Sequence, residues 1–339
     1  KNDKVSILGY GCMRWPMKKD EEGKDIIDQE KVNELIDYAI EKGVNYFDAA
    51  PVYLQGQCEA ATGEALSRHP RESYFVATKL SNFKDASRAE GIRMYKASLE
   101  AFRTDYLDYY LLHSIKNAAT FTKRFVENGL MDFLMEERDA GRIRNLGFSF
   151  HGNQEGFDEL MALHEKYHWD FVQIQLNYVD FEDASVQSRK CLEVCRKHGK
   201  PVIVMEPVKG GSLVNLPQEA AELLPDYSQA GYAIRFAASP ENVFMVLSGM
   251  SNTEQMEDNL SYMKEFKPLN EHEEAVIAKA VEALNADKSI PCTACHYCTP
   301  GCPMQINIPE IFAAMNQNLV FGEPEKAKEM YVEVLGAGS

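Results

Sequence analysis

The feature that most constrains the fold of this chain is a unit that occurs eight times: a short apolar run followed by a stretch with helical periodicity. Runs that are apolar on both faces and alternate with helices are typical of a parallel sheet buried by helices. Eight units favour closure into a (β/α)8 TIM barrel over an open doubly wound α/β sheet, and no Gly-x-Gly-x-x-Gly turn follows a run. The predicted strands are Val5–Gly9, Val44–Phe47, Tyr74–Thr78, Tyr106–Leu112, Arg144–Phe148, Phe171–Gln175, Pro201–Met205 and Val243–Ser248.

The predicted helices place their apolar residues three and four positions apart, as Val32, Leu35, Ile36 and Ala39 do. From residue 290 to residue 309 the sequence is instead rich in cysteine, proline and glycine and has little periodicity. We therefore expect two domains, a barrel over residues 1–286 and a small, mostly helical, cysteine-rich module over residues 287–339. The predicted helices are Glu30–Lys42, Glu90–Phe102, Thr122–Ala140, Ser185–His198, Gln229–Ala238, Glu271–Asn285, Glu310–Asn318 and Glu325–Leu335.

The charge and the cysteine pattern exclude several classes of partner and location. A net charge of −16 without a basic tract disfavours nucleic acids and anionic lipids. No apolar run reaches the ~20 residues that span a membrane. Cys12, Cys58, Cys191 and Cys195 are scattered through the predicted core and helices, which is not the pattern of a disulfide framework. Reduced thiols are typical of the cytoplasm, where we expect this protein to act. The sequence does not indicate an oligomeric state.

Polar residues follow the second, third and fourth predicted strands, at the end where barrel enzymes bind their substrates. They are Asp48, with Tyr53 in the same loop, then Lys79 and His113. Reducing a carbonyl requires a proton donor to the developing alkoxide, and a tyrosine with a pKa of ~10 needs a nearby cation to serve at neutral pH. Lys79, held by Asp48, would be that cation, and His113 would orient the substrate oxygen. Singly, each residue also fits a structural role, whereas the four together favour catalysis.

These segments also resemble a known family, the aldo-keto reductases. The resemblance extends from about Val5 to Asn259. It implies a TIM barrel, an extended nicotinamide cofactor across the strand ends, and Tyr53 as the general acid. The motifs that carry the resemblance are Gly9–Arg14, Asn45–Tyr53, Val76–Lys79 and Asp108–His113.

The resemblance also implies the contacts with the cofactor. Ser149 and Gln173 match residues that hold the nicotinamide carboxamide in the family, whereas Phe150 replaces the usual Asn. Met205 replaces an aromatic ring that stacks on the nicotinamide; a thioether packs on such a face too, and simple barrel packing is the alternative. The implied cofactor-binding residues are Met13, Arg14, Asp48, Ser149, Gln173, Met205, Pro207, Val208, Gly249, Gln255, Asp258 and Asn259.

The choice between NADPH and NADH depends on one position. The segment Ser248–Asn259 resembles the family's adenosine-phosphate clamp, but Gln255 replaces the Arg that grips the 2′-phosphate. A phosphate of that charge favours a guanidinium or an ammonium group. The resemblance thus implies NADPH, and Gln255 leaves NADH open, with Lys209 or Arg14 as substitute cations for NADPH.

Four further cysteines lie within eleven residues near the C-terminus. Cys292, Cys295, Cys298 and Cys302, followed by Pro303, have the Cys-x2-Cys-x2-Cys-x3-Cys-Pro spacing of bacterial ferredoxins. A subset of prokaryotic aldo-keto reductases is similar in carrying a ferredoxin-like tail, which implies a [4Fe-4S] cluster. Zinc is the alternative, although four-thiolate zinc sites usually come as two separated pairs. We expect Cys302 to be the fourth ligand; a barrel cysteine or a partner protein is the alternative.

The sequence therefore predicts an enzyme that reduces a small-molecule aldehyde or ketone with NAD(P)H. The alternative is a nicotinamide-binding redox-sensing or electron-transfer subunit whose cysteine tail contacts a redox partner protein. The intact Tyr53 and Lys79 favour the enzyme, because a binding subunit needs no proton donor. Trp15, Phe83 and Tyr178 are candidates for the wall of the substrate pocket, with ordinary packing as the alternative.

Overall fold

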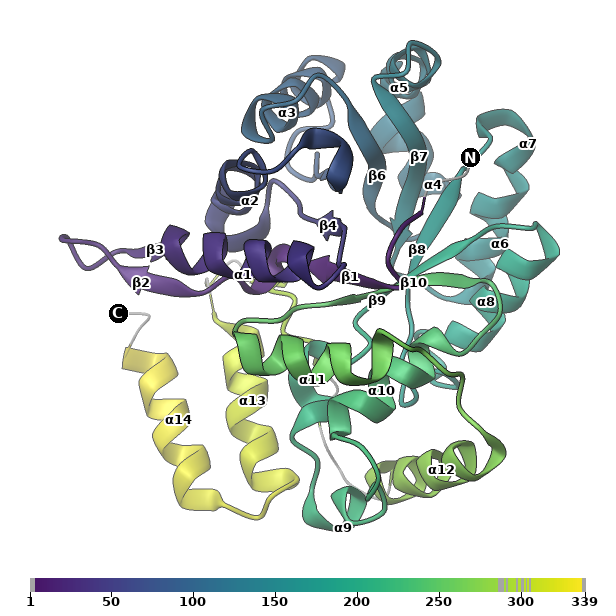
Figure 1. Ribbon diagram of the computed structural model, residues 1–339. Helices are drawn as coiled ribbons and strands as arrows, with labels where there is room; N and C mark the ends of the chain where they lie inside the picture. The colour runs from purple at the N-terminus through teal and green to yellow at the C-terminus, as the bar shows by residue number, and fades with distance from the viewer. Residues whose placement is uncertain are drawn as a thin grey trace.

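Eight parallel strands close into a barrel in the order β1-β10-β9-β8-β7-β6-β5-β4, with helices around it (Figure 1). The computed structural model describes residues 4–285, 290, 292–296, 298–299, 302, 304 and 306–336. The predicted barrel is confirmed, and every predicted apolar run overlaps one of its strands. The strands are β1 (Leu8–Gly11), β4 (Tyr46–Asp48), β5 (Phe75–Leu80), β6 (Leu107–Ile115), β7 (Ile143–Phe150), β8 (Phe171–Gln175), β9 (Val202–Met205) and β10 (Val243–Ser248).

Alternate residues of the strands fill the interior of the barrel, because successive side chains of a strand point to opposite faces. The residues between them point outward and pack under the helices, as Phe47 and Tyr110 do in the main hydrophobic core. The barrel is therefore a packed core and not a pore. Its interior cluster consists of Tyr46, Ala77, Tyr109, Leu111, Phe171, Ile203, Met245 and Leu247.

The outer helices cover the barrel with their apolar faces. In α1, Val32, Leu35, Ile36 and Ala39 are buried, as their spacing predicts. The helices of this layer are α1 (Gln29–Glu41), α2 (Cys58–Leu66), α3 (Arg88–Ala101), α4 (Ala118–Phe121), α5 (Leu130–Asp139), α6 (Gln154–Ala162), α7 (His164–Tyr167), α8 (Ser188–Lys197), α10 (Gln229–Ala238) and α11 (Thr253–Met263), whereas α9 (Gln218–Ala221) belongs to a second hydrophobic core.

Departures from the predicted helices have local causes. The stretch from residue 122 to residue 140 is not one helix, because a π-helical turn at Thr122–Val126 is followed by Gly129 at a φ of +69° before α5 begins. Helix α2 escapes prediction because it is built largely from small residues. Its Gly63 lies so close to α3 that a Cβ atom would be 2.1 Å from the carbonyl oxygen of Ala101. A hairpin of β2 (Met17–Lys19) and β3 (Asp25–Ile27) was also not predicted.

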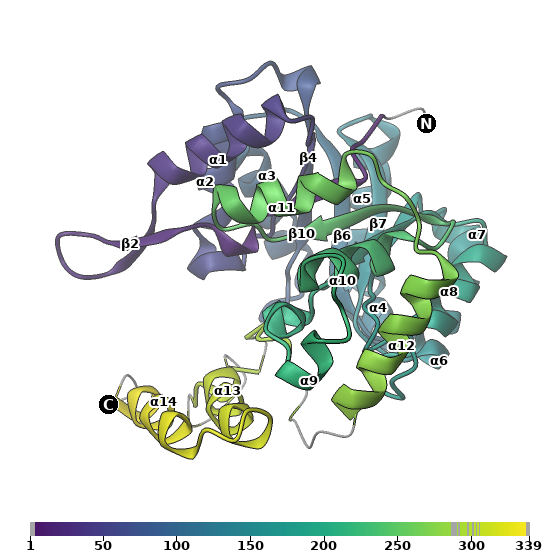
Figure 2. The same ribbon diagram turned by 60° about the horizontal axis from the view of Figure 1, so that its bottom comes forward.

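In the described residues after the last barrel strand and its helix, three helices follow: α12 (Glu271–Asn285), α13 (Ile308–Leu319) and α14 (Pro324–Gly336). Helix α12 packs beside α9 in a second hydrophobic core. Helices α13 and α14 pack against each other and lie outside the ring of barrel helices in Figure 1 and Figure 2. The predicted domain boundary at residue 286 lies outside the described residues. Among the described helices, none has the length and apolar character needed to cross a bilayer.

Candidate active site

Strand alternation brings three polar side chains into the barrel interior at the C-terminal ends of the strands. Asp48, Lys79 and His113 each lie two positions beyond an interior core residue of the same strand. In the register of the sheet, Asp48 pairs with Ala77, and Lys79 pairs with Leu111. Lys79 and His113 are each only 1% exposed. The convergence expected from the sequence therefore follows from the pairing of β4, β5 and β6.

Lys79 and Asp48 form a buried ion pair. The Lys79 Nζ atom also donates a hydrogen bond to the Ala49 carbonyl oxygen at 2.9 Å, and Gln173 Nε2 donates to Asp48 Oδ2 at 3.2 Å. Burial raises the pKa of Asp48, whereas the Lys79 ammonium and the Gln173 hydrogen bond oppose that rise. These contacts hold the ammonium group in one place. Because the buried surroundings have a low dielectric constant, its charge acts strongly on nearby groups.

Tyr53 lies over this ion pair. It begins a short helical turn, η2 (Tyr53–Gly56), and the Lys79 Nζ atom is 4.9 Å from the centroid of its ring. The Tyr53 and His113 rings are 5.9 Å apart and meet nearly at right angles. Leu54 and Gln55 adopt φ angles of +49° and +56°. Because such angles are uncommon outside glycine, the surrounding structure must impose this turn, which carries Tyr53 over the barrel.

His113 is held in its neutral form. Burial lowers the pKa of His113 well below its usual range, and the nearby Lys79, His151 and Arg124 lower it further. The His113 Nδ1 atom lies 2.5 Å from the Ser81 hydroxyl, which fixes the plane of the ring. A neutral imidazole has one donor and one acceptor nitrogen, so His113 suits hydrogen bonding rather than charge pairing.

A cleft of about 640 Å³ opens above these residues. Asp48, Tyr53 and His113 line it, whereas Lys79 lies beneath its floor. All the residues that the family resemblance implied as cofactor-binding line the cleft. Several further residues that the sequence did not indicate as cofactor contacts also line the cleft, among them His151, Glu206, Gly210, Glu254, Thr293 and Cys295.

Two buried amide oxygens in the wall of the cleft have no hydrogen-bond partner among the described residues: Gln173 Oε1 and Asn259 Oδ1. The nitrogen of each amide is already engaged, with Asp48 for Gln173 and with the Tyr262 hydroxyl, at 3.0 Å, for Asn259. A buried acceptor without a donor is costly, and a ligand that brings an N–H group would satisfy it. The cleft thus has two separate places, at Gln173 and at Asn259, where an amide oxygen would accept a hydrogen bond from a ligand N–H group.

One end of the cleft has few positive charges. Gln255 Oε1 accepts a hydrogen bond from the Ser251 backbone N–H at 2.7 Å. In the described part of the chain, Arg14 is the only Arg or Lys among the residues that line the cleft. Lys209 is instead buried in an ion pair with Asp180 and does not line the cleft. The interpretation of Lys209 as a substitute phosphate ligand is therefore not supported, and Arg14 is the cation that lines the cleft.

Comparison with known proteins places most of the chain in a family. Residues 7–282 match the model of the aldo/keto reductase family. The chain belongs to the aldo/keto reductase family. It is accordingly an oxidoreductase, and the alternative of a redox-sensing or electron-transfer subunit is not favoured.

Relatives and solved structures agree with this assignment. The chain is 24% identical to an uncharacterized oxidoreductase, YqkF, of Bacillus subtilis, over 81% of this chain and 95% of that protein. It is 26% identical to a probable aldo-keto reductase of soybean (Glycine max), over 74% and 70%. The holo form of aldo-keto reductase AKR11C1 from Bacillus halodurans superposes with a TM-score of 0.66 at 26% identity, covering 81% of this chain and 92% of that one. An aldo-keto reductase from Klebsiella pneumoniae in complex with NADPH has the same fold, with a TM-score of 0.65 at 19% identity over 81% and 90%.

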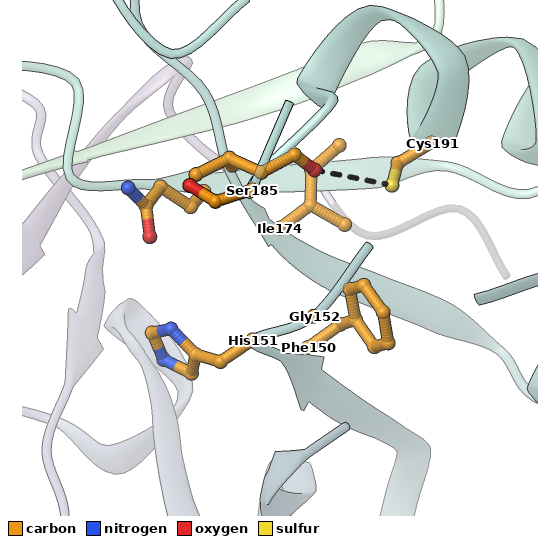
Figure 3. A pocket seen from close by; sticks show the side chains of 8 residues that line it. Phe150, His151, Gly152, Ile174, Ser185 and Cys191 are labelled. Atoms are coloured by element: carbon orange, nitrogen blue, oxygen red, sulfur yellow. Dashed lines mark hydrogen bonds between the residues drawn. The ribbon is translucent and has the colours of Figure 1, made fainter. Parts of the chain in front are cut away.

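A second, smaller cavity of about 110 Å³ lies beside the cleft of this aldo/keto reductase. Figure 3 shows Phe150 and His151 on one side of it and Ile174 and Cys191 on the other. His151 lines both the cavity and the cleft, and burial lowers its pKa to about 4. Phe150, which replaces the family's usual Asn, lines the small cavity and not the cleft.

The aromatic residues suggested for the substrate pocket separate into two groups. Trp15 and Tyr178 are buried in hydrophobic cores and do not line the cleft, and the Trp15 indole donates a hydrogen bond to the Thr62 hydroxyl at 2.9 Å. Ordinary packing, the alternative for both, explains them. Phe83 is 44% exposed, and its ring centroid is 5.2 Å from that of His113. Phe83 is therefore the one of the three beside the catalytic candidates.

All eight cysteines of this aldo/keto reductase are free thiols. The Ala294 backbone N–H donates to Cys292 Sγ at 3.4 Å, and burial raises the pKa of Cys292, with smaller contributions from the Cys295 and Cys298 thiols. Within the described ranges, however, no group of three or more His, Cys, Asp or Glu side chains is arranged to hold a metal ion. The iron–sulfur module stays a prediction, and Pro303 lies outside the described residues.

Proposed function

We propose that this protein reduces an aldehyde or ketone to an alcohol, with NADH or NADPH as hydride donor and Tyr53 as proton donor. The observation that carries the proposal is the position of Lys79: its buried ammonium, paired with Asp48, lies 4.9 Å from the centroid of the Tyr53 ring. Tyr53 itself lines the cleft, where a carbonyl substrate has access to it. A structural ion pair would need neither the tyrosine above it nor the cleft.

Residues of this chain would neutralise and stabilise the negative charge that develops on the carbonyl oxygen. A bound reduced nicotinamide supplies the hydride to the carbonyl carbon. Tyr53 gives its proton to the oxygen, and Lys79 stabilises the phenolate that remains. Asp48 holds Lys79 in place, since the ion pair is buried. Neutral His113 orients the carbonyl by hydrogen bonding and adds no competing charge at the reacting centre.

The residues of the cleft fit a nicotinamide dinucleotide. Gln173 Oε1 lacks a donor, as a carboxamide N–H would supply, and the Ser149 hydroxyl accepts from the Ser114 backbone N–H at 2.8 Å, so it keeps its own proton to donate. Asn259 Oδ1 likewise lacks a donor and suits an exocyclic amine of adenine. Met205 would pack on the nicotinamide face, and Arg14 would bind phosphate.

We further propose that Cys292, Cys295, Cys298 and Cys302 hold a [4Fe-4S] cluster, with zinc as the alternative. The ferredoxin spacing, the free thiols and the backbone N–H bound to Cys292 Sγ support this proposal. Such a cluster supplies one-electron redox chemistry or a covalent staple. Reduced thiols and a cluster of this kind also favour a cytoplasmic location.

The test of the reductase is a comparison of the native protein with Tyr53→Phe. Both are purified without oxygen, and the oxidation of NADH and of NADPH is followed in the presence of a reactive diketone. We expect turnover by the native protein and a kcat lower by about 10²-fold or more for Tyr53→Phe, as for the loss of a general acid. Equal turnover by the two proteins would show that Tyr53 does not donate the proton.

A further inference from the structure

We propose that the cysteine segment, residues 290–302, forms one wall of the dinucleotide site, and that contacts of Thr293 with Gly210 and Glu206 anchor it there. The inference rests on the proposed function, because it concerns the affinity of the same cleft for NADH and NADPH. It adds residues from outside the barrel to the site. Thr293 and Cys295 line the same cleft as Tyr53 and His113.

The cysteine segment packs closely against the barrel at Gly210. This glycine, in η5 (Lys209–Val214) after β9, has a φ of +65°. A Cβ atom placed on it would lie 2.1 Å from the carbonyl oxygen of Thr293. Any other residue would push the segment off the barrel, because a contact below 3 Å between such atoms requires one of them to move. The neighbouring Gly211 has a φ of +103°, yet no described atom comes within 4 Å of its Cβ position.

A second contact adds to this close packing. Burial raises the pKa of Glu206, the residue after β9, and the nearby Thr293 side chain opposes that rise. The Oε2 atom of Glu206 is inaccessible to solvent and has no hydrogen-bond partner among the described residues. Glu206 is thus a buried carboxyl group of the cleft wall within reach of the Thr293 side chain, and both residues line the cleft. If the segment left, this carboxyl would be open to water and would ionise next to the phosphates of a bound dinucleotide, which repel it.

The loop that carries Glu206 is itself held from below. Asn177 Nδ2 donates to the Glu206 carbonyl oxygen at 3.1 Å and to Asp180 Oδ2 at 2.7 Å. Asp180 in turn forms the buried ion pair with Lys209. These contacts hold Glu206 and Lys209 at positive φ angles, +56° and +49°, that their side chains do not favour. The platform under the cysteine segment is therefore fixed.

The cysteine segment also contacts the C-terminal helix α13. The amide of Asn316 in α13 makes two hydrogen bonds of 2.7 Å with the backbone of Ile290, one as donor and one as acceptor. The His296 imidazole lies 3.5 Å from the Glu310 carboxylate, also in α13. The segment thus joins α13 to the cleft wall, so that its conformation, and any metal that fixes it, acts on the dinucleotide site.

The experiment uses the full-length protein, purified without oxygen, and two matched pairs of variants. Thr293→Val removes the anchoring hydroxyl, and Thr299→Val makes the same change in the same segment at a residue that does not line the cleft. Gly210→Ala displaces the segment, and Gly211→Ala adds a methyl group at positive φ to a cleft residue whose Cβ position has no described atom within 4 Å. Dissociation constants for NADH and NADPH are measured by fluorescence titration, and iron content and visible absorption are recorded for each protein.

For Thr293→Val we expect both dissociation constants to rise about 2- to 10-fold, the range expected for the loss of one polar contact, while Thr299→Val stays within about twofold of the native protein. Gly210→Ala should weaken binding more than Gly211→Ala does. Adding Glu206→Gln to Thr293→Val should restore part of the affinity, because it removes the exposed charge. If the members of each pair bind alike while the native protein binds nucleotide, the inference is wrong and the proposed function stands. If the native protein binds neither nucleotide, the proposed function fails and the inference with it.

Discussion

Replacing Gln255 with Arg should give this enzyme a preference for NADPH that the native protein lacks. The perturbation acts where α11 begins, in the segment that resembles the adenosine-phosphate clamp. In the native protein, Gln255 Oε1 is engaged by the Ser251 backbone N–H, and Glu254 beside it adds a carboxylate to the cleft wall. A 2′-phosphate would meet this negative charge at a position that contributes no guanidinium of its own.

Among the described residues that line the cleft, Arg14 is the only Arg or Lys. The Arg14 side chain packs on Gly249, where a Cβ atom would lie 3.0 Å from Arg14 Cγ. Its charge also lowers the pKa of Glu206, although less than burial raises it, so the guanidinium lies within electrostatic range of the β9 end. The pyrophosphate common to both nucleotides would therefore engage Arg14. We expect the native protein to bind NADH more tightly than NADPH.

The magnitude follows from the new contact. A hydrogen bond between charged groups contributes about 1.5–3 kcal/mol, and solvent screening at this exposed position reduces it to about 1–2 kcal/mol. Gln255→Arg should therefore tighten NADPH about 5- to 30-fold and leave NADH nearly unchanged. The assay is fluorescence titration with both nucleotides. Gln255→Leu is the control, since it loses the same bond to Ser251 and adds no charge.

Two results would refute this reasoning. One is a native protein that binds NADPH at least about tenfold more tightly than NADH, which would mean that another group already binds the 2′-phosphate. The other is a Gln255→Arg variant that tightens both nucleotides equally, which would place the new guanidinium on the pyrophosphate.

Three further predictions concern the ion pair, the buried carboxyl and the cysteines. Lys79→Met should abolish turnover and lower the free energy of unfolding by about 3–5 kcal/mol, because it leaves the Asp48 carboxylate buried without its partner; denaturant titration measures this, and the double variant with Asp48→Asn should recover much of the loss. Burial raises the pKa of Glu206 to about 7, with Asp180 adding to the rise and Lys209, Thr293 and Arg14 opposing it. Since an anionic dinucleotide favours the protonated carboxyl, nucleotide affinity should be constant well below pH 7 and fall above it by at most about tenfold per pH unit, and a native-like fall in Glu206→Gln would assign it to another group. Cys302→Ser should lower iron and sulfide content and Cys191→Ser should not; unchanged iron in Cys302→Ser would remove it from the ligand set.

The sequence was sufficient for the barrel because the two periodicities that define it are local. Helix α10 and strands β8 and β10 have the predicted bounds, since each is a complete apolar pattern. The prediction failed where packing or a single backbone angle decides. Helix α2 depends on the close approach of Gly63 to α3, and the break before α5 depends on Gly129. Neither leaves a periodic signal.

The residues of the candidate site likewise fall into those that local sequence patterns predict and those that tertiary packing determines. Asp48, Lys79 and His113 were predictable because strand ends and the alternation of side chains determine where they meet. Tyr53 required more, since its position over Lys79 depends on two residues at positive φ that no propensity favours. The exclusion of Lys209 from the cleft depends on Asp180, which nothing in the sequence pairs with it.

For the cysteine segment, the sequence and the structure give different kinds of information. Spacing alone predicts a metal for the cysteines but gives them no relation to the cleft. Gly210 and Glu206 look unremarkable in sequence, since a glycine and a glutamate after a strand have many ordinary uses. Only their contacts with Thr293 relate the two regions. Because Thr293 follows directly after Cys292, whatever fixes that cysteine also fixes the anchor, and nucleotide affinity should therefore respond to the state of the cysteines even if no electron passes between them and the nicotinamide.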